Sequence, residues 1–307
     1  MATVRPSDRG ADARTDAGAA RGDSDSSDGW ANPAPVGLLD LPVEQRLEPA
    51  RRRAAGCRRQ LDDDRRDRPR RVASPDFSSA GGYGIPFNVV GASTPRSTVS
   101  FQYDGESDHM GYPIPSSPSI EGGSDRHLLM IDTNRCTLFE LFAAAQGSGG
   151  WTAGSGAVWS LGSNDLRTDG WTSADAAGLP IFAGLVRYSE VASGAIAHAI
   201  RFTAPQTCAG YIYPARHEAG SGSCSSRPPM GLRVRLKASV DIAGSGPQSQ
   251  VILTALQRYG MLLADNGSPW YITGAPDGHW NDDELHGLGQ LTGTDFEVVD
   301  TTGFVNG

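Results

Sequence analysis

Acidic side chains in apolar surroundings are the first candidates for chemistry in this sequence. Glu140 stands within the apolar run TLFELF at 137–142. A carboxylate there must be paired, hydrogen-bonded or shifted in pKa, because burying a bare charge costs several kcal/mol. Asp132 ends the preceding apolar run, and Asp175 lies in a polar loop, where it can also cap a short helix. Glycoside hydrolysis needs two facing carboxyl groups, so we predict that Glu140 pairs with Asp175 or Asp132.

Further carboxylates fall at predicted strand ends or in loops, namely Glu190, Glu218, Asp265, Asp282 and Asp283. Asp265 directly precedes Asn266-Gly267, which is a strong signal for a hairpin turn. That position explains Asp265 structurally, so it does not enter the predicted catalytic pair.

Three histidines are candidates for moving or orienting protons. His127 precedes an apolar run, and His217 stands beside Glu218, so each can act as a general base or a metal ligand. His198 lies on an apolar strand face, where it can equally be a core residue. The spacings match no HExxH pattern and no GxSxG motif occurs, so we predict neither a metal nor a cofactor nor a serine nucleophile.

Tryptophans near turns point to sugar as a partner. Aromatic rings in loops stack on the C–H faces of sugars, although the same residues also fill cores. The residues in question are Trp151, Trp159, Trp171, Trp270, Tyr271 and Trp280. We predict that Trp171 and Trp270 hold a polysaccharide or oligosaccharide.

A row of cations lies along the segment LRVRLK. Strict alternation places Arg233, Arg235 and Lys237 on one face of a predicted strand. This face can be solvated, can pair with an interior carboxylate such as Glu140 or Asp132, or can bind an anionic sugar. We therefore take Arg233 and Arg235 as candidate substrate-binding residues.

The element that must position this chemistry is the segment 127–142, HLLMIDTNRCTLFELF. Its two apolar runs predict adjoining strands joined by a turn at 133–136, and their apolar residues on both faces predict a central position. The expected register places Asp132 opposite Thr137, Met130 opposite Phe139 and Leu128 opposite Leu141. Glu140 then lies on the other face, with Leu129, Ile131 and Leu138.

Composition predicts a β-rich fold with many turns, because the 307 residues include 39 Gly and 20 Pro and only 20% are charged. Helices are predicted at 183–192, 248–259 and 282–288, and a hairpin is predicted around Asn266-Gly267. We predict a single antiparallel β-sandwich of jelly-roll type over residues 80–307. Residues 1–79 are rich in mixed charges and are predicted to be a disordered tail.

Charge and hydropathy exclude some classes of partner. The net charge of −8 argues against nucleic acid, which needs a concentrated basic surface. The sequence contains no apolar run long enough for a membrane helix. Cys208 and Cys224 bracket a Gly- and Ser-rich loop and can form a disulfide, or they can be two small buried residues. A disulfide favours a secreted or cell-surface protein. The chain shows no recognisable signal peptide, and a misassigned start that masks one is an alternative interpretation.

Five blocks stand out between about Gly81 and Asp300, and they read DRHLLMID, SADAAGLP, HAIRFT, PPMGLRVRLKASVD and YGMLLADNG. With these blocks the segment resembles a group of uncharacterised, mostly secreted bacterial β-rich proteins. The resemblance implies secretion and a β-sandwich-like body, and it implies no catalytic assignment.

Together these features predict a secreted carbohydrate-active enzyme, a glycoside hydrolase acting on a polysaccharide. A non-catalytic carbohydrate-binding or cell-surface module that uses the same aromatic residues is one alternative. The other is a lyase on uronate polymers, in which the cations neutralise the substrate carboxylate.

Overall fold

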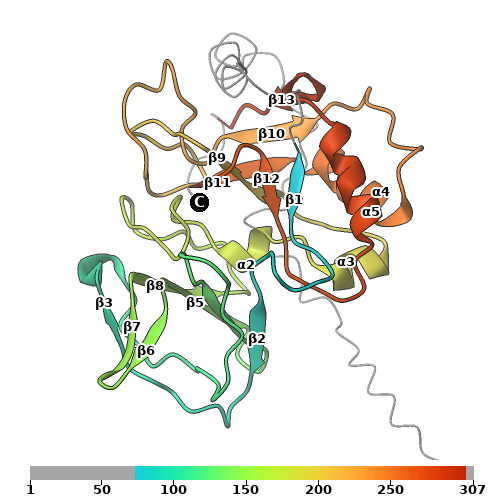
Figure 1. The fold of residues 1–307 in the computed structure, drawn as a ribbon. Coiled ribbons are helices and arrows are strands. Elements are labelled where there is room, and N and C mark those ends of the chain that lie inside the picture. The colour runs from blue at the N-terminus through green and yellow to red at the C-terminus, as the bar shows by residue number, and fades with distance from the viewer. Residues whose placement is uncertain (1–72, 302–307) are drawn as a thin grey trace, which may run out of the picture. The chain divides into compact units, whose positions relative to one another are not determined.

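The computed structural model describes residues 73–301, which form mainly strands in three sheets with a few short helices (Figure 1). The β-rich class predicted from composition is confirmed. Most of the predicted disordered tail lies outside the described residues. The predicted boundary at residue 80 lies too late, because strand β1 (Ser74–Asp76) already pairs with β12 (Tyr271–Thr273).

The predicted central hairpin consists of β4 (Leu128–Asp132) and β5 (Thr137–Phe142), and every residue of β4 is buried. The predicted register is confirmed, with pairs Leu128–Leu141, Met130–Phe139 and Asp132–Thr137. Apolar residues occupy both faces of this hairpin, which explains why the sequence shows no polar side.

The hairpin lies at the centre of a four-stranded sheet with the order β2-β4-β5-β8. Its outer strands are β2 (Phe87–Val90) and β8 (Ser155–Ser160). One face packs against a three-stranded sheet of β3 (Val99–Phe101), β7 (Gly150–Ala153) and β6 (Ala145–Gly147). The other face packs against helix α2 (Ile181–Gly184). Because both faces are covered, a charged residue such as Glu140 is enclosed by the protein.

The largest sheet has six strands in the order β1-β12-β9-β11-β10-β13. The strands not yet named are β9 (Ile200–Ala204), β10 (Arg233–Leu236), β11 (Met261–Asn266) and β13 (Phe296–Val298). Helices α4 (Pro247–Arg258) and α5 (Asp282–His286) lie beside this sheet and share its apolar core (Figure 1). The remaining helices are α3 (Tyr188–Ser193) and the 3₁₀ helices Asp104–Glu106, Gly287–Gln290 and Gly293–Asp295.

Strand pairing differs from the predicted sandwich. Residues 73–301 form three sheets rather than one antiparallel sandwich, and pairs such as β9–β11 and β2–β4 are parallel. The hairpin predicted around Asn266-Gly267 does not form, because β9 lies between β11 and β12. Turn residues signal a change of direction, whereas the partner of each strand is set by packing across the whole core.

The cationic row is distributed among local partners. Arg233 is buried and donates to the carbonyl of Tyr259, and Arg235 pairs with Glu297 at 2.7 Å. Lys237 lies beyond the end of β10 and donates to the carbonyl of Thr294. Desolvation lowers the pKa of Arg233 to about 10. None of the three contacts Glu140 or Asp132 in the described residues, so the row does not neutralise the predicted catalytic carboxylates.

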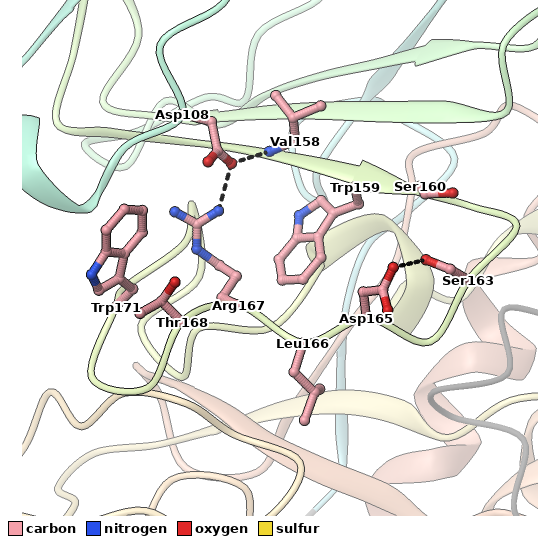
Figure 2. A pocket seen from close by; sticks show the side chains of 10 residues that line it. All are labelled: Asp108, Val158, Trp159, Ser160, Ser163, Asp165, Leu166, Arg167, Thr168 and Trp171. Carbon is pink, nitrogen blue, oxygen red and sulfur yellow. Dashed lines mark hydrogen bonds and ion pairs between the residues drawn. The ribbon is translucent and has the colours of Figure 1, made fainter. Parts of the chain in front are cut away.

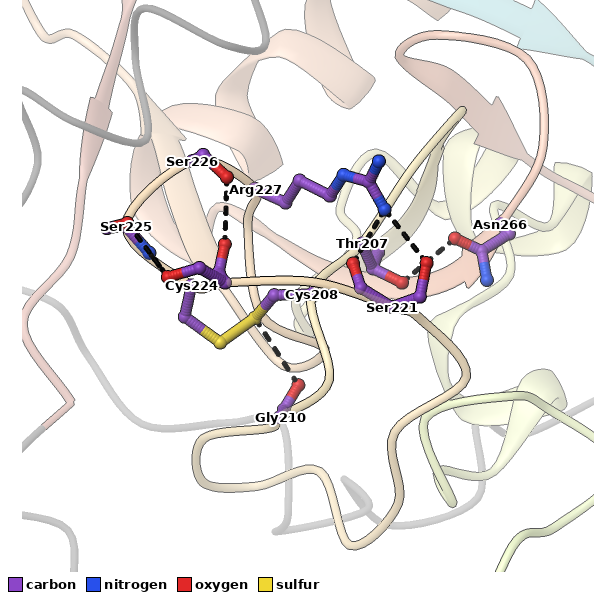
Figure 3. The surroundings of a disulfide bond; sticks show 10 residues. Thr207, Cys208, Gly210, Ser221, Cys224, Ser225, Ser226, Arg227 and Asn266 are labelled. Atoms are coloured by element: carbon purple, nitrogen blue, oxygen red, sulfur yellow. Dashed lines mark hydrogen bonds between the residues drawn. A yellow bond between two sulfur atoms is a disulfide. The ribbon is translucent and has the colours of Figure 1, made fainter.

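The disulfide between Cys208 and Cys224 is present and closes a loop of 16 positions (Figure 3). Closing a loop of this length contributes about 3 kcal/mol through the entropy of the unfolded chain. A hydrogen bond from Thr207 to the Asn266 side chain ties the same loop to the end of β11. Within residues 73–301, no helix has the length and hydropathy needed to cross a membrane.

Candidate functional site

Glu140 is enclosed completely, and three N–H groups converge on its carboxylate. The backbone N–H groups of Ile181 and Phe182 donate at 3.1 and 2.9 Å, and the indole of Trp159 donates at 3.3 Å. Glu140 thus supplies the acceptor that the first turn of α2 lacks, since Pro180 has no capping side chain. Desolvation raises the pKa of Glu140 from 4.5 to about 7, against the lowering effect of the two backbone donors.

Replacing Glu140 with Gln should destabilise the protein by about 1–3 kcal/mol, because the amide nitrogen must face at least one buried N–H group. The raised pKa also predicts that native stability falls as pH rises from 4.5 to about 7, and the variant should lose this dependence. Urea unfolding across that pH range measures both effects. Glu218→Gln, on an exposed side chain, is the control, and equal stability of the two variants would contradict the enclosed role of Glu140.

Two of the predicted catalytic residues have local structural partners elsewhere. Asp132 accepts from the backbone N–H groups of Asn134 and Arg135 in the hairpin turn and lies 3.6 Å from Arg96. His198 contacts Glu190 and the carbonyl of Ala199. The structure therefore does not bring Asp132 or His198 together with Asp175.

Asp175 belongs to a buried group centred on Arg201 of β9. The guanidinium donates to both carboxylate oxygens of Asp175, at 3.1 and 2.9 Å, and to the hydroxyl of Thr273 at 2.8 Å. The Nη2 atom of Arg201, which donates to Asp175 at 2.9 Å, also lies 3.5 Å from the carboxylate of Asp265. A bidentate pair of this kind fixes both side chains strongly. We call Asp175, Arg201 and Asp265 the Arg201 cluster.

Asp265 is the member of the cluster that solvent reaches. Its side chain is 22% exposed, whereas those of Arg201 and Asp175 are 5% and 1% exposed. Partial burial raises the pKa of Asp265 to about 7, and the nearby charge of Asp175 adds to the effect while Arg201 opposes it. An accessible carboxyl group with such a pKa holds a proton near neutral pH and can donate it.

The sequence did not single out Asp265, because the turn signal after it already explained an acidic residue. A usable signal was present in the chain. Asp265 follows the run MLLA near the carboxyl end of a buried strand. Polar side chains at the carboxyl ends of strands often reach solvent and line sites.

His127 lies behind the cluster in a buried ion pair. Its Nδ1 atom is 2.5 Å from the carboxylate of Glu121, and its Nε2 atom is 3.1 Å from the carbonyl of Ala174, next to Asp175. Burial favours the neutral ring, but the hydrogen bond to Glu121 outweighs it and raises the pKa of His127. The same bond outweighs burial at Glu121 and lowers the pKa of that carboxyl. His127 is enclosed, and it helps to position Asp175 through its hydrogen bond to the backbone of Ala174.

His217 lies next to the cluster and is only half-buried. Its Nδ1 atom is 2.8 Å from the carbonyl of Ala176, which assigns the ring proton to Nδ1 and leaves Nε2 as the acceptor. The backbone of Ala177 bonds to His217 on one side and to Ala264 on the other. His217 and Asp265 thus flank a single stretch of backbone.

A pocket of about 280 Å³ lies between β8 and the loop that follows it (Figure 2). It is lined by the indoles of Trp159 and Trp171, the charged Asp108, Asp165 and Arg167, the hydroxyls of Ser160, Ser163 and Thr168, and by Val158 and Leu166. We call this the Trp pocket. Its lining includes Trp171, which we predicted from the sequence to hold sugar. It also includes Trp159, whose indole N–H donates a hydrogen bond to Glu140.

Arg167 holds the two indoles in place. Its guanidinium carbon lies 5.7 Å from the ring centre of Trp159 and 5.6 Å from that of Trp171 (Figure 2). The guanidinium also donates to Asp108 at 2.7 Å and to the carbonyl of Thr172 at 2.6 Å. A buried cation with this many partners keeps the pocket preformed.

The Trp pocket and the Arg201 cluster are neighbours along one loop. Arg216 donates to the carbonyl of Arg167 at 3.1 Å. Gly178 has a φ of +68°, and a Cβ there would lie 2.7 Å from the carbonyl oxygen of Trp171 and 3.4 Å from the Cβ of His217. Only glycine permits this close approach. The backbone of Trp171 and the side chain of His217 therefore both pack against Gly178.

Comparison with protein-family models, curated proteins and solved structures found no match to this chain. The resemblance to a secreted bacterial group thus stays a prediction. Between residues 73 and 301, no three His, Cys, Asp or Glu side chains gather in a way that could hold a metal ion.

Trp270 has a different position from the one predicted. It is 4% exposed, stacks on Phe202 and packs at a tilt against Phe296 in the core of the six-stranded sheet. The sequence places Trp171 and Trp270 alike beside turns, and only tertiary packing separates a ring that fills the core from one that reaches a pocket.

Proposed function

We propose that this chain is a glycoside hydrolase acting on a polysaccharide, with Asp265 as its general acid. The observation that supports this proposal best is the Arg201 cluster. Two carboxylates lie within 3.5 Å of one guanidinium nitrogen, and only the carboxyl with the raised pKa is accessible. Pairs of acidic groups whose environments differ in this way are typical of acid–base catalysis.

The remaining roles follow from exposure. Asp265 donates its proton to the glycosidic oxygen as the bond to the sugar carbon breaks. The Nε2 atom of His217 takes a proton from the water that attacks that carbon, so the number of protons balances. Asp175 is too enclosed to meet a substrate and positions Arg201, and His127 and Glu140 likewise act from within the protein. This assignment differs from the carboxylate pair predicted from the sequence, because Asp265 takes the place of Glu140 beside the reacting bond and Asp175 positions Arg201 instead of meeting the substrate.

The Trp pocket holds one sugar unit of the substrate in this proposal. Its volume of about 280 Å³ lies just below the range of small-molecule pockets, roughly 300–1,000 Å³, which suits one sugar unit rather than several. Indole faces and hydroxyl groups suit a sugar ring, which presents C–H groups on its faces and O–H groups at its edge. Asp175, which is paired with Arg201 in the cluster, follows Trp171 by four positions in the same loop, and in this proposal a chain of sugars extends from the pocket toward Asp265.

Replacing Trp171 with Ala should weaken oligosaccharide binding by about tenfold, which corresponds to losing about 1.4 kcal/mol of stacking. Titration calorimetry with a panel of oligosaccharides measures the change. Tyr83→Ala removes an exposed aromatic ring that does not line the pocket and serves as the control. Equal binding by both variants would show that sugar does not occupy the Trp pocket.

A non-catalytic carbohydrate-binding module is the second candidate, because the Trp pocket alone is sufficient for binding. It predicts full binding and no cleavage by the wild type. The lyase alternative has less support, since Arg233, Arg235 and Lys237 each have a local partner, and Arg216 beside His217 pairs with Asp169. Lyase cleavage would produce unsaturated uronate, which an absorbance assay detects directly.

We also propose that the protein acts outside the cytoplasm. The disulfide between Cys208 and Cys224 supports an oxidising compartment. Separating culture medium, cell surface and cytoplasm of the native organism and probing each for the chain tests this. Recovery from the cytoplasm alone, with both thiols reduced, would contradict it.

A further inference from the structure

Carboxylates outnumber cations in the Trp pocket. Asp108 and Asp165 line it, and Arg167 is the one Lys or Arg side chain among its lining residues. Asp108 already has partners within the protein, because it accepts hydrogen bonds from Arg167 at 2.7 Å and from the backbone N–H of Val158 at 2.8 Å. The pairing of Asp108 with Arg167 cancels one charge of each sign, which leaves the charge of Asp165.

Asp165 is exposed and lines the pocket at its edge. Trp159 and Leu166 lie beside it there (Figure 2). Among the residues that the structure describes, the hydroxyl of Ser163 is its hydrogen-bond partner, at 2.8 Å. No cation lies against it in the described residues, whereas the neighbouring carboxylate of Asp169 has Arg216 at 3.0 Å. The pocket therefore presents an anionic oxygen next to indole faces and hydroxyls.

This combination distinguishes between classes of sugar. A uronic acid would bring a second carboxylate against Asp165, and like charges this close repel. A neutral sugar could only offer a hydroxyl, whereas an amino sugar offers an ammonium group. The ammonium forms a charge-assisted hydrogen bond, which is roughly twice as strong as a neutral one. A small amine without a ring would leave the indole faces uncovered.

We propose that the Trp pocket selects a sugar unit carrying a free amino group, with the ammonium bound to Asp165. The inference rests on the proposed sugar-binding role of this pocket and names the substrate class, a polysaccharide that contains unacetylated hexosamine. The hydroxyls of Ser160, Ser163 and Thr168 and the ring of Trp171 bind the rest of the unit.

The test compares glucosamine oligosaccharides with their N-acetylated, glucose and glucuronate counterparts of equal length, by calorimetric titration at a pH below the pKa of the amine. The free amine should bind about three to five times more tightly than the acetylated form, the range expected for a solvent-exposed ion pair, and added salt should reduce this difference. In Asp165→Asn the two forms should bind equally, because the anionic oxygen that distinguishes the free amine is gone. Asp169→Asn, at a carboxylate outside the pocket lining, should retain the preference.

The outcomes separate the two proposals. If neutral sugars bind through Trp171 but the amine gives no advantage, or if Asp165→Asn keeps the advantage, the amino-sugar assignment is wrong and the pocket still binds sugar. If none of the four series binds to the wild type, the proposed sugar-binding role itself fails. Tighter binding of glucuronate than of the other series would overturn the charge argument.

Discussion

Replacing Asp265 with Asn should reduce glycoside hydrolysis by about a hundredfold to ten-thousandfold, the usual contribution of a general acid. Asn has nearly the same shape and can still face Arg201, but it carries no acidic proton for the leaving group. Circular dichroism should show that the fold is intact, since the side chain is partly exposed and its loss leaves Asp175 paired. Asp283→Asn, on an exposed turn of α5, is the matched control.

The pH dependence provides an independent measure of the same role. The pKa of Asp265 is raised to about 7, and a general acid works only in its protonated form, so activity should fall as pH rises through about 7. The raised pKa also links Asp265 to stability, because the folded protein holds its proton more tightly than the unfolded chain does. The stability that this group contributes is therefore lost as pH rises from 3.8, its ordinary pKa, to about 7. Asp265→Asn should remove both dependences. An unchanged rate and pH profile in the variant would exclude Asp265 from the mechanism.

Replacing Arg201 with Met should destabilise the fold by about 3–5 kcal/mol, the usual effect of breaking a buried ion pair. Met has a similar length but leaves Asp175 enclosed without its two charge-assisted bonds, and it leaves the hydroxyl of Thr273 without its donor. Urea unfolding measures the loss. Arg135→Met is the matched control, since Arg135 is exposed and its ion pair to Asp132 is 3.9 Å long.

A double variant separates the ion pair from simple packing. Arg201→Met with Asp175→Asn removes the uncompensated charge, so it should recover a large part of the stability that the single variant loses. A loss of less than about 1 kcal/mol in Arg201→Met would show that the cluster is exposed to water in solution.

Local patterns predicted the parts of this fold that depend on adjacent residues. The hairpin of β4 and β5 forms in the predicted register because a short turn joins two apolar runs, and a shift by one position would expose one of them. The disulfide between Cys208 and Cys224 was likewise anticipated from a short loop. The enclosure of Glu140 followed from its apolar neighbours, but its partners, the N–H groups of α2 and Trp159, come from distant positions.

The cluster around Arg201 was not predictable from spacing. Asp175, Arg201 and Asp265 are separated by long stretches of chain, and they meet because β9 and β11 pair in parallel while the loop before α2 packs across their ends. Arg233 illustrates the opposite case, because strand alternation predicted a free cationic face, whereas Arg233 bonds to the backbone of Tyr259 and Arg235 pairs with Glu297 of the neighbouring β13. In both cases the partner of a strand decides the role of its charged residues, and short-range periodicity does not report that partner.

We propose that this chain hydrolyses a polysaccharide with Asp265 as the acid. The most direct test is mass spectrometry of the products that wild-type protein and Asp265→Asn release from glucosamine-containing, neutral and uronate polysaccharides. Hydrolysis adds the mass of one water for each bond broken, whereas lyase cleavage adds none. We predict water-added products from the wild type and very little product from the variant. Products without added water, or no product from any substrate that binds to the wild type, would contradict the account.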